Sequence, residues 1–316
     1  MAENNVDLSV VAPVYNERET LPELQERLSA VLDGMNRSYE IIFVNDGSAD
    51  GSREMLHEMA QADARIRVVD LTRNFGQNPA AYAGLSRSQG RYTVLIDADL
   101  QVLPEDIPLL VAKLEEGYDV AVGWRMNRQD TFFRKLTSRM FNWYIARVTG
   151  LPLHDYGCNL KAMNRETVDG MCRLQHRCRY MPADLAMLGG RVAEVRVGHA
   201  ARKKGQSKYN FLKLVRAALD MLTGITDAPL RLIGFFGWTM ALVGSLVGVR
   251  VIILRLTVGD ILQMQSVVAL FLFCTGVQLV ATGLMCEYIG RIFVEVQRRP
   301  YFVIHEDAAK NDGSRQ

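Results

Sequence analysis

The sequence predicts an α/β fold with a doubly wound sheet, followed by two helices that cross a membrane. Short apolar runs alternate with helical segments through the first hundred residues, and polar side chains follow these runs. Residues 1–225 are typical of a soluble protein. Residues 232–256 and 261–286, in contrast, are almost wholly apolar, and each run is long enough to span a bilayer.

Predicted strands and helices alternate in a regular order. The strand segments are 8–17, which runs into a loop, 40–44, 66–71 and 92–96. A helix opens at Thr20 behind the first strand, with its leucines spaced for one face, and another covers 79–89. Alternation of this kind indicates a parallel, doubly wound sheet.

Polar side chains stand at the carboxyl ends of these strands. They are Asn16, Asp46, Arg73 and Asp97. Doubly wound sheets bind ligands in the crevice beyond those ends. The turn at 45–52, which includes Ser48, is rich in groups that can bind a ribose or a base. The sequence therefore predicts one nucleotide site at this edge of the sheet.

The segment 96–101, Ile-Asp-Ala-Asp-Leu-Gln, follows the last of these strands. On an extended backbone residues i and i+2 point to the same side, so Asp97 and Asp99 can converge and Gln101 extends the row. Two carboxylates that close repel unless a cation lies between them or one is protonated. Such oxygen ligands suit Mg²⁺ or Mn²⁺ shared with a phosphate. The alternative is a solvated acidic turn.

Composition argues against two other kinds of site. The formal net charge of the 316 residues is only +2, so nothing global indicates nucleic-acid binding. The five cysteines contain no CxxC pair and the five histidines are scattered, so no zinc site is expected. We expect reduced thiols and a domain that faces the cytosol.

Five segments together resemble the GT-A-fold glycosyltransferases of family 2, specifically the polyprenyl-phosphate glycosyltransferases. They are VVAPVYNE (10–17), EIIFVNDGSADGS (40–52), LTRNFGQNPAAYAGL (71–85), IDADLQ (96–101) and GQSKY (205–209). Segments 116–135 and 155–162 look closest to the undecaprenyl-phosphate 4-deoxy-4-formamido-L-arabinose transferases. Dolichol-phosphate mannose synthases and undecaprenyl-phosphate glucosyltransferases are the next relatives. With the two apolar runs, the resemblance covers nearly the whole chain.

The resemblance implies that a nucleotide sugar binds at the strand ends and that Mg²⁺ or Mn²⁺ neutralises its leaving diphosphate. Asp97, Asp99 and Gln101 are the expected metal ligands, and Asp99 is expected to be catalytic. The residues that we expect to bind the donor are Pro13, Tyr15, Asn16, Glu17, Asp46, Ser48, Arg73, Asp97, Arg202, Ser207 and Lys208. The alternatives are an ordinary turn at 13–16, a helix cap at 46–48 and a solvated charge run at 199–209.

The acceptor implied by the resemblance is a lipid phosphate, undecaprenyl phosphate. A phosphate monoester is largely dianionic near neutral pH, so a strong general base is less necessary than for a hydroxyl acceptor. Arg125, Arg134 and Ser138 match the residues that hold this phosphate in the mannose synthases, and the last two lie on one helical face. Asp155 is the expected catalytic base or orienting group. The alternative is a structural carboxylate paired with a nearby arginine.

Two places depart from the resemblance. Val102-Leu103 stands where many relatives carry a polar residue and a proline, which affects the fit of the donor. The mannose and glucose branch often carries a second acid at the position of Cys158. The aminoarabinose branch has a cysteine there, as this chain does. A lone cysteine with no adjacent histidine indicates packing and not a nucleophile.

Four parts are expected along the chain. They are a cytoplasmic GT-A catalytic domain at 1–210, a juxtamembrane amphipathic helix at 211–230, a two-helix transmembrane hairpin at 231–288 and a cytoplasmic segment at 289–316. Within the first part, 132–149 is expected to form an amphipathic helix at the membrane surface, or else a core-packed helix with solvated charges. Arginines flank the hairpin and the loop 257–265 has no Lys or Arg, so both termini are expected in the cytoplasm.

The expected function is inverting sugar transfer from a UDP-sugar, with UDP-4-deoxy-4-formamido-L-arabinose as first candidate, to undecaprenyl phosphate. The reaction is expected on the cytoplasmic leaflet of a bacterial inner membrane, for modification of lipid A or another envelope glycan. The alternatives are a glucose or mannose synthase, a processive synthase, whose usual QxxRW segment is absent, and a non-catalytic lipid-binding or translocating protein. The resemblance also implies a homo-oligomer, a tetramer with the strand-like segment 301–304 in its contacts.

Overall fold

The computed structural model describes residues 6–125, 145–147, 150–174, 179–198, 200, 264–297 and 299–305, with scattered positions between 233 and 257. The chain divides into two compact units, Met1–Ser207 with Pro300–Gln316, and Lys208–Arg299. The predicted helix at 211–230 and, apart from 145–147, the one at 132–149 lie outside the described residues.

The first unit is built on a seven-stranded sheet with the order β3-β2-β1-β4-β6-β5-β7. The strands are β1 (Leu8–Val14), β2 (Tyr39–Asn45), β3 (Ile66–Asp70), β4 (Tyr92–Leu95), β5 (Val120–Arg125), β6 (Lys161–Asn164) and β7 (Val192–Val197). β1 pairs in parallel with β2 and β4, and β2 with β3, which confirms the predicted parallel half. β6 runs antiparallel to β4 and β5, so the complete sheet is mixed.

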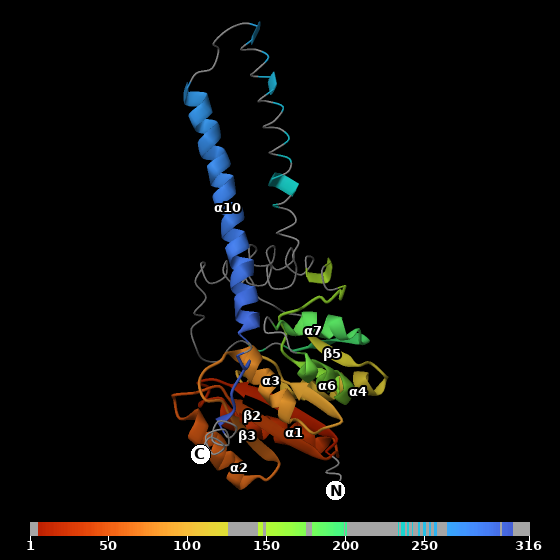
Figure 1. The fold of residues 1–316 in the computed structure, drawn as a ribbon. Helices are drawn as coiled ribbons and strands as arrows, with labels where there is room; N and C mark the ends of the chain where they lie inside the picture. Colours follow the sequence, from red (N-terminus) through yellow and green to blue (C-terminus); the bar gives the residue numbers. More distant parts are fainter. Residues whose placement is uncertain are drawn as a thin grey trace. The chain divides into compact units, whose positions relative to one another are not determined.

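Helices cover both faces of this sheet (Figure 1). They are α1 (Leu21–Gly34), α2 (Ser52–Ala62), α3 (Gln77–Arg87), α4 (Ile107–Glu115), α6 (Arg165–Arg173) and α7 (Met181–Leu188), and a 3₁₀ turn at Pro104–Asp106 precedes α4. The leucines of α1, together with Leu110 and Leu114 of α4, share one core with Val10 and Ile96. α3 packs against β1 and β2, where it meets Val11 and Val44. Because Val10 and Val11 point to opposite faces, the unit has three layers.

Gly84 allows α3 to approach the sheet closely. A Cβ atom there would lie 2.3 Å from Cγ1 of Val11 and 2.9 Å from Cγ2 of Val44. This packing fixes α3 over β1 and β2, and α3 begins with Gln77 shortly after the carboxyl end of β3. The close contact therefore helps to position the first residue of α3 at the predicted site edge.

The second unit contains α10 (Met264–Val296), a continuous helix of 33 residues. Large apolar side chains are exposed along it, among them Phe271, Leu279, Val280 and Phe293. Judged by length and hydropathy, none of the helices in the described parts of the chain qualifies as a membrane span. The first predicted span, 232–256, lies largely outside those parts.

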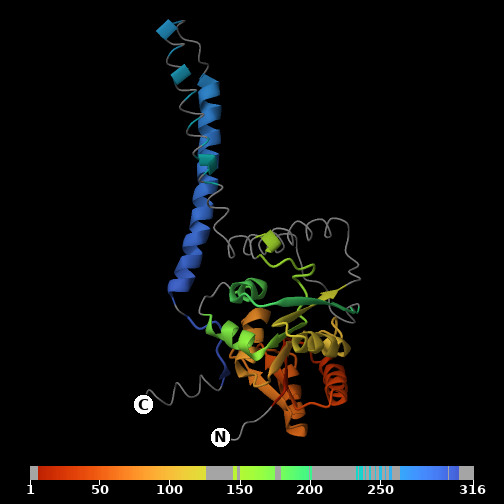
Figure 2. The same cartoon turned by 90° about the vertical axis from the view of Figure 1, so that its right-hand side faces the viewer.

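The segment 300–305 belongs to the first unit, together with the sheet. Leu71, directly after β3, forms an isolated antiparallel bridge with Ile304. The strand predicted at 301–304 is therefore present as a single bridge. In Figure 2 this segment, coloured blue, reaches the part of the unit that is coloured orange.

Candidate active site

The segment 96–101 forms a turn at the carboxyl end of β4. β4 ends at Leu95, and Leu100 has a left-handed backbone with φ 59°. The extended backbone predicted for this segment is therefore wrong. A left-handed leucine costs about 1–2 kcal/mol, a strain of the kind that clusters at functional sites.

Burial still alternates along this turn. Ala98 and Leu100 are 3% and 4% exposed, whereas Asp97 and Asp99 are half-buried. The apolar residues belong to the same core as α1. The two carboxylates are therefore the accessible groups of the turn, and Gln101, also half-buried, continues the row that the sequence predicts.

Two amide side chains hold the carboxylate of Asp97. Gln77 donates from Nε2 to Oδ1 at 2.5 Å, and Asn159 donates from Nδ2 to Oδ2 at 3.0 Å. Burial raises the pKa of Asp97 and the charge of Asp99 adds to that rise, while the two amides oppose it by stabilising the anion. Sequence reasoning gave neither amide a role, although both lie in segments that carry the family resemblance, 71–85 and 155–162.

Neighbouring segments fasten this turn. Oδ1 of Asp99 accepts a hydrogen bond from the backbone N of Gln101 at 3.1 Å. The backbone O of Gln101 accepts from the N of Ala200 at 2.9 Å. Thr20, before α1, donates from Oγ1 to the O of Ala98 at 2.9 Å. The chain that leads into 199–209 is therefore attached beside the two carboxylates. The predicted donor residues of that loop, Arg202, Ser207 and Lys208, lie outside the described residues.

The loops after β1 and β2 bind each other. The N of Asn16 donates to Oγ of Ser48 at 3.1 Å, and Oδ1 of Asn16 accepts from the N of Ala49 at 2.8 Å. The N of Glu17 donates to Oγ of Ser52 at 3.2 Å. Asn16 and Ser48, predicted to bind the donor, thus join two loops of the site. Tyr15 beside them is 50% exposed, and Pro13 is half-buried.

Asp46 fastens the loop after β3. Its carboxylate, 2% exposed, accepts from the N of Phe75 at 2.7 Å and the N of Gly76 at 2.9 Å. Burial raises the pKa of Asp46, and these two bonds oppose the rise. Gly47, with φ +68°, is required where the loop passes, because a Cβ there would lie 2.6 Å from the N of Asn74. In the same loop, the guanidinium of Arg73 lies over the ring of Phe75, 4.3 Å from its centroid.

Arg125 and Asp155 form a buried ion pair. Nε of Arg125 donates to Oδ2 at 2.7 Å and an Nη donates to Oδ1 at 3.0 Å, and the side chains are 13% and 4% exposed. Burial lowers the pKa of Arg125, but the bond and the charge of Asp155 outweigh it, so the net shift is upward. Asp155 is therefore paired with an arginine in the structure, which is the alternative that the sequence left open to a role as catalytic base. The other predicted acceptor residues, Arg134 and Ser138, lie outside the described residues.

A buried lysine lies in this region. Lys161 is 2% exposed and donates from Nζ to the backbone O of Cys158. Burial lowers the pKa of Lys161, while the charge of Asp97 is among those that oppose this shift. Burial also raises the pKa of the Cys158 thiol, which is fully buried. Cys158 is therefore a packing residue, as predicted, and Lys161 is a site neighbour that sequence reasoning missed.

The groups at this turn fit a divalent cation. Among the residues that the structure describes, no three His, Cys, Asp or Glu side chains gather as a metal site. The ligands predicted from the sequence are the carboxylates of Asp97 and Asp99 and the side chain of Gln101, and all three residues are half-buried. Mg²⁺ is commonly held by one or two carboxylates together with substrate phosphates and water. The turn therefore suits a cation that arrives with a phosphate-bearing ligand.

Comparisons with known proteins show the family of the chain. Residues 9–171 match glycosyl transferase family 2. The chain is 45% identical over 303 residues, 95% of its length and 93% of the relative's, to the undecaprenyl-phosphate 4-deoxy-4-formamido-L-arabinose transferase of Proteus mirabilis (strain HI4320). Glucosyl-3-phosphoglycerate synthase from Mycobacterium tuberculosis, solved with Mn²⁺, UDP and phosphoglyceric acid, has a similar fold, with TM-score 0.53 and 20% identity over 71% of this chain and 78% of that one. The chain therefore belongs to glycosyl transferase family 2 and is a glycosyltransferase.

Proposed function

We propose that this glycosyltransferase moves a sugar from a UDP-sugar to undecaprenyl phosphate, with inversion at the anomeric carbon. The observation that carries the proposal is the pair of half-buried carboxylates, Asp97 and Asp99, beside the interlocked loops of β1, β2 and β3. The relative from P. mirabilis, similar along 95% of this chain, is named for transfer to that lipid. We propose 4-deoxy-4-formamido-L-arabinose as the sugar and lipid A as the envelope glycan that is modified.

On the donor side, the turn at 96–101 is proposed to bind the diphosphate together with Mg²⁺ or Mn²⁺. The cation supplies Lewis-acid stabilisation of the charge that develops on the leaving diphosphate. Asp97, Asp99 and Gln101 would hold it, and Gln77 and Asn159 orient the carboxylate of Asp97. The exposed ring of Tyr15 and the guanidinium of Arg73 are proposed to contact the nucleotide.

On the acceptor side, the lipid phosphate is proposed to bind near Arg125. An oxygen of this phosphate attacks the anomeric carbon while the bond to the diphosphate breaks, and the electron pair leaves with UDP. Because the phosphate monoester is already largely ionised near neutral pH, no strong base is needed. Asp155 can then act by holding Arg125, to which it is bound through two hydrogen bonds.

We propose that residues 231–288 anchor the enzyme in the bacterial inner membrane with both termini in the cytoplasm. Two apolar runs support this proposal, as do the exposed large side chains along α10. The arginine distribution supports the orientation. This arrangement supplies the lipid acceptor on the leaflet that the catalytic domain faces.

Formation of a lipid-linked monosaccharide tests the function. Purified enzyme is incubated with undecaprenyl phosphate, Mg²⁺ or Mn²⁺ and a panel of labelled UDP- and GDP-sugars. A UDP-sugar is expected to give labelled lipid and UDP in equal amounts, and chelation of the metal is expected to stop the reaction. A translocase or a lipid-binding protein forms no such product, and preferential use of a GDP-sugar contradicts the proposed donor.

Replacing Asn159 should weaken the response to metal without removing a proposed metal ligand. Asn159→Ala leaves Oδ2 of Asp97 without its donor, and a loss of roughly 10- to 100-fold in apparent metal affinity is expected, typical of groups that orient a ligand. The measurement is the Mn²⁺ concentration for half-maximal transfer.

The control for this prediction is Gln61→Ala, an exposed amide on α2. It should leave the Mn²⁺ requirement unchanged. An Asn159→Ala variant that equals wild type in its metal requirement contradicts the assigned role of this amide.

A further inference from the structure

The C-terminal segment 301–304 pairs with the chain directly after β3. Leu71 and Ile304 form an antiparallel bridge, and the backbone N of Thr72 donates to the O of Val303 at 3.0 Å. The side chains at the bridge are well covered, since Leu71 is 4% and Ile304 is 5% exposed. β3 is one of the two edge strands of the sheet, and an edge strand offers unpaired backbone groups to an added segment.

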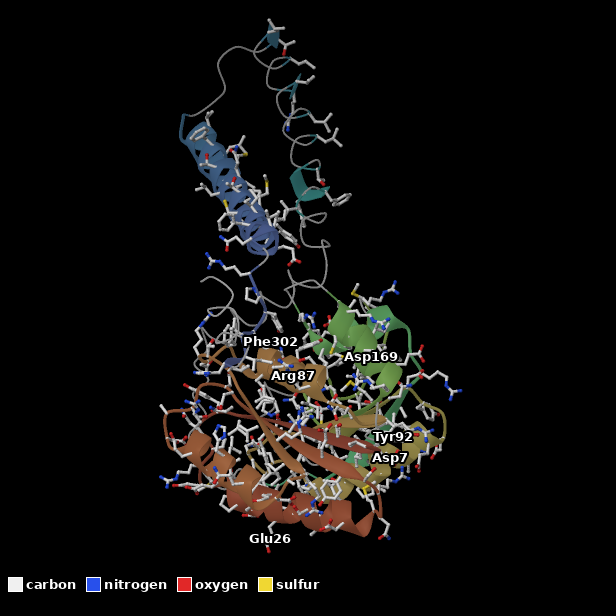
Figure 3. The ribbon with its side chains drawn as sticks, turned by 60° about the horizontal axis from the view of Figure 1, so that its bottom comes forward. Asp7, Glu26, Arg87, Tyr92, Asp169 and Phe302 are labelled. Atoms are coloured by element: carbon white, nitrogen blue, oxygen red, sulfur yellow. The ribbon has the colours of Figure 1, made fainter. Side chains whose placement is uncertain are left out.

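The same segment also contacts α3. The ring of Tyr301 meets the ring of Tyr82 edge-on, with centroids 5.8 Å apart and planes at 80°. The guanidinium of Arg179 lies over both rings, 4.4 Å from the centroid of Tyr82 and 5.4 Å from that of Tyr301. In Figure 3 Phe302, the next residue, is labelled close to α3. The segment is therefore attached to a helix as well as to a strand end.

These two contacts lie on either side of the loop 73–76. The strand contact precedes the loop in the chain and the helix contact follows it. Between them, the amides of Phe75 and Gly76 bind the buried carboxylate of Asp46. The loop is thus fastened at its centre by Asp46 and at both flanks by the C-terminal segment. It carries Arg73 and leads directly into Gln77, which holds Asp97.

We propose that segment 301–304 is a positioning element for the nucleotide-sugar donor. By holding Thr72 and Tyr82, it keeps the loop 73–76 in the conformation that Asp46 binds. A donor that requires this conformation binds more weakly when the loop adopts others, in proportion to the fraction of molecules that are competent. Once the donor is bound the loop is ordered again, so the chemical step is little affected. The inference rests on the proposed function, because it takes the ligand of this loop to be the donor.

Weakening the segment in the full-length protein tests this role. The double variant Ile304→Ala with Tyr301→Leu removes the buried side chain at the bridge and the edge-on ring contact. Hydrogen exchange of the Thr72, Phe75 and Gly76 amides is expected to become roughly a hundredfold faster or more, because KM rises only when the loop is open in a large fraction of the variant molecules. The KM for the UDP-sugar is expected to rise about three- to tenfold, with kcat within about twofold of wild type.

The control removes residues 306–316 and keeps 301–304, and it is expected to match wild type in both measurements. Unchanged exchange in the double variant overturns the proposal, and so does faster exchange with an unchanged KM. If no UDP-sugar supports transfer in wild type, the proposed function fails, while hydrogen exchange still reports whether the segment holds the loop. Should the double variant not fold, Ile304→Val is expected to show smaller shifts in the same directions.

Discussion

Replacing Asp99 with asparagine is expected to lower the rate of sugar transfer by about a thousandfold or more. The substitution removes the charge proposed to bind the metal and changes the shape of the side chain very little. The turn should persist, because Oδ1 of asparagine can still accept the hydrogen bond that Asp99 receives from the N of Gln101 at 3.1 Å. Initial rates with labelled UDP-sugar, undecaprenyl phosphate and saturating Mn²⁺ give the effect, and thermal unfolding reports whether the fold is retained.

Asp63→Asn is the matched control for this substitution. It makes the same chemical change just before β3, at the opposite end of the sheet, where Asp63 pairs with Arg65 at 2.8 Å. Such solvated pairs contribute about 0–1 kcal/mol, so neither the rate nor the stability should change much. An Asp99→Asn enzyme that keeps a tenth or more of the wild-type rate would falsify the metal assignment.

The parallel half of the sheet could be predicted from the sequence because its signals are local. Each of the first four strands is a short apolar run, and each is followed by a helix or a polar turn. β6 gives no such signal, because it has only four residues and lies directly before the helix α6. It pairs antiparallel with β4, which lies more than sixty residues earlier in the chain. A pairing of that range depends on the tertiary fold, which local periodicity does not encode.

In the candidate site, too, local features could be predicted from the sequence and long-range contacts could not. Asp97 and Asp99 could be predicted because their chemistry and spacing lie within one short segment. The amides that hold Asp97 could not, because Gln77 and Asn159 are 20 and 62 residues away in the chain. Asp46 illustrates a second limit. The sequence places a carboxylate at the end of β2, but it does not determine whether that carboxylate faces a ligand or the neighbouring loop, which Asp46 binds through two backbone amides.

Removing Asp155 is expected to destabilise the catalytic domain by about 3–5 kcal/mol, because Asp155→Ala leaves the buried guanidinium of Arg125 without its partner. The matched control is Glu105→Ala. Glu105 also binds an arginine through two hydrogen bonds, from Nε and an Nη of Arg27 at 2.9 and 2.6 Å, but this pair is 25% and 50% exposed. Its loss should cost about 0–1 kcal/mol. Thermal or denaturant unfolding of the full-length proteins measures the loss of stability in each variant. Equal losses in Asp155→Ala and Glu105→Ala contradict the prediction that burial makes the Arg125–Asp155 pair the more important one.

A double-mutant cycle then separates the two roles of Asp155 in transfer. If Asp155 acts by holding Arg125, Asp155→Asn should raise the KM for undecaprenyl phosphate roughly tenfold, and the double variant should be no worse than Arg125→Met. If Asp155 is instead the general base, the activity losses of the single variants Asp155→Asn and Arg125→Met should multiply in the double variant. Asp155→Asn should then lower mainly kcat. We expect the non-additive result. The two hydrogen bonds between Arg125 and Asp155 occupy both carboxylate oxygens, and an ionised phosphate acceptor has little need of a base to take its proton.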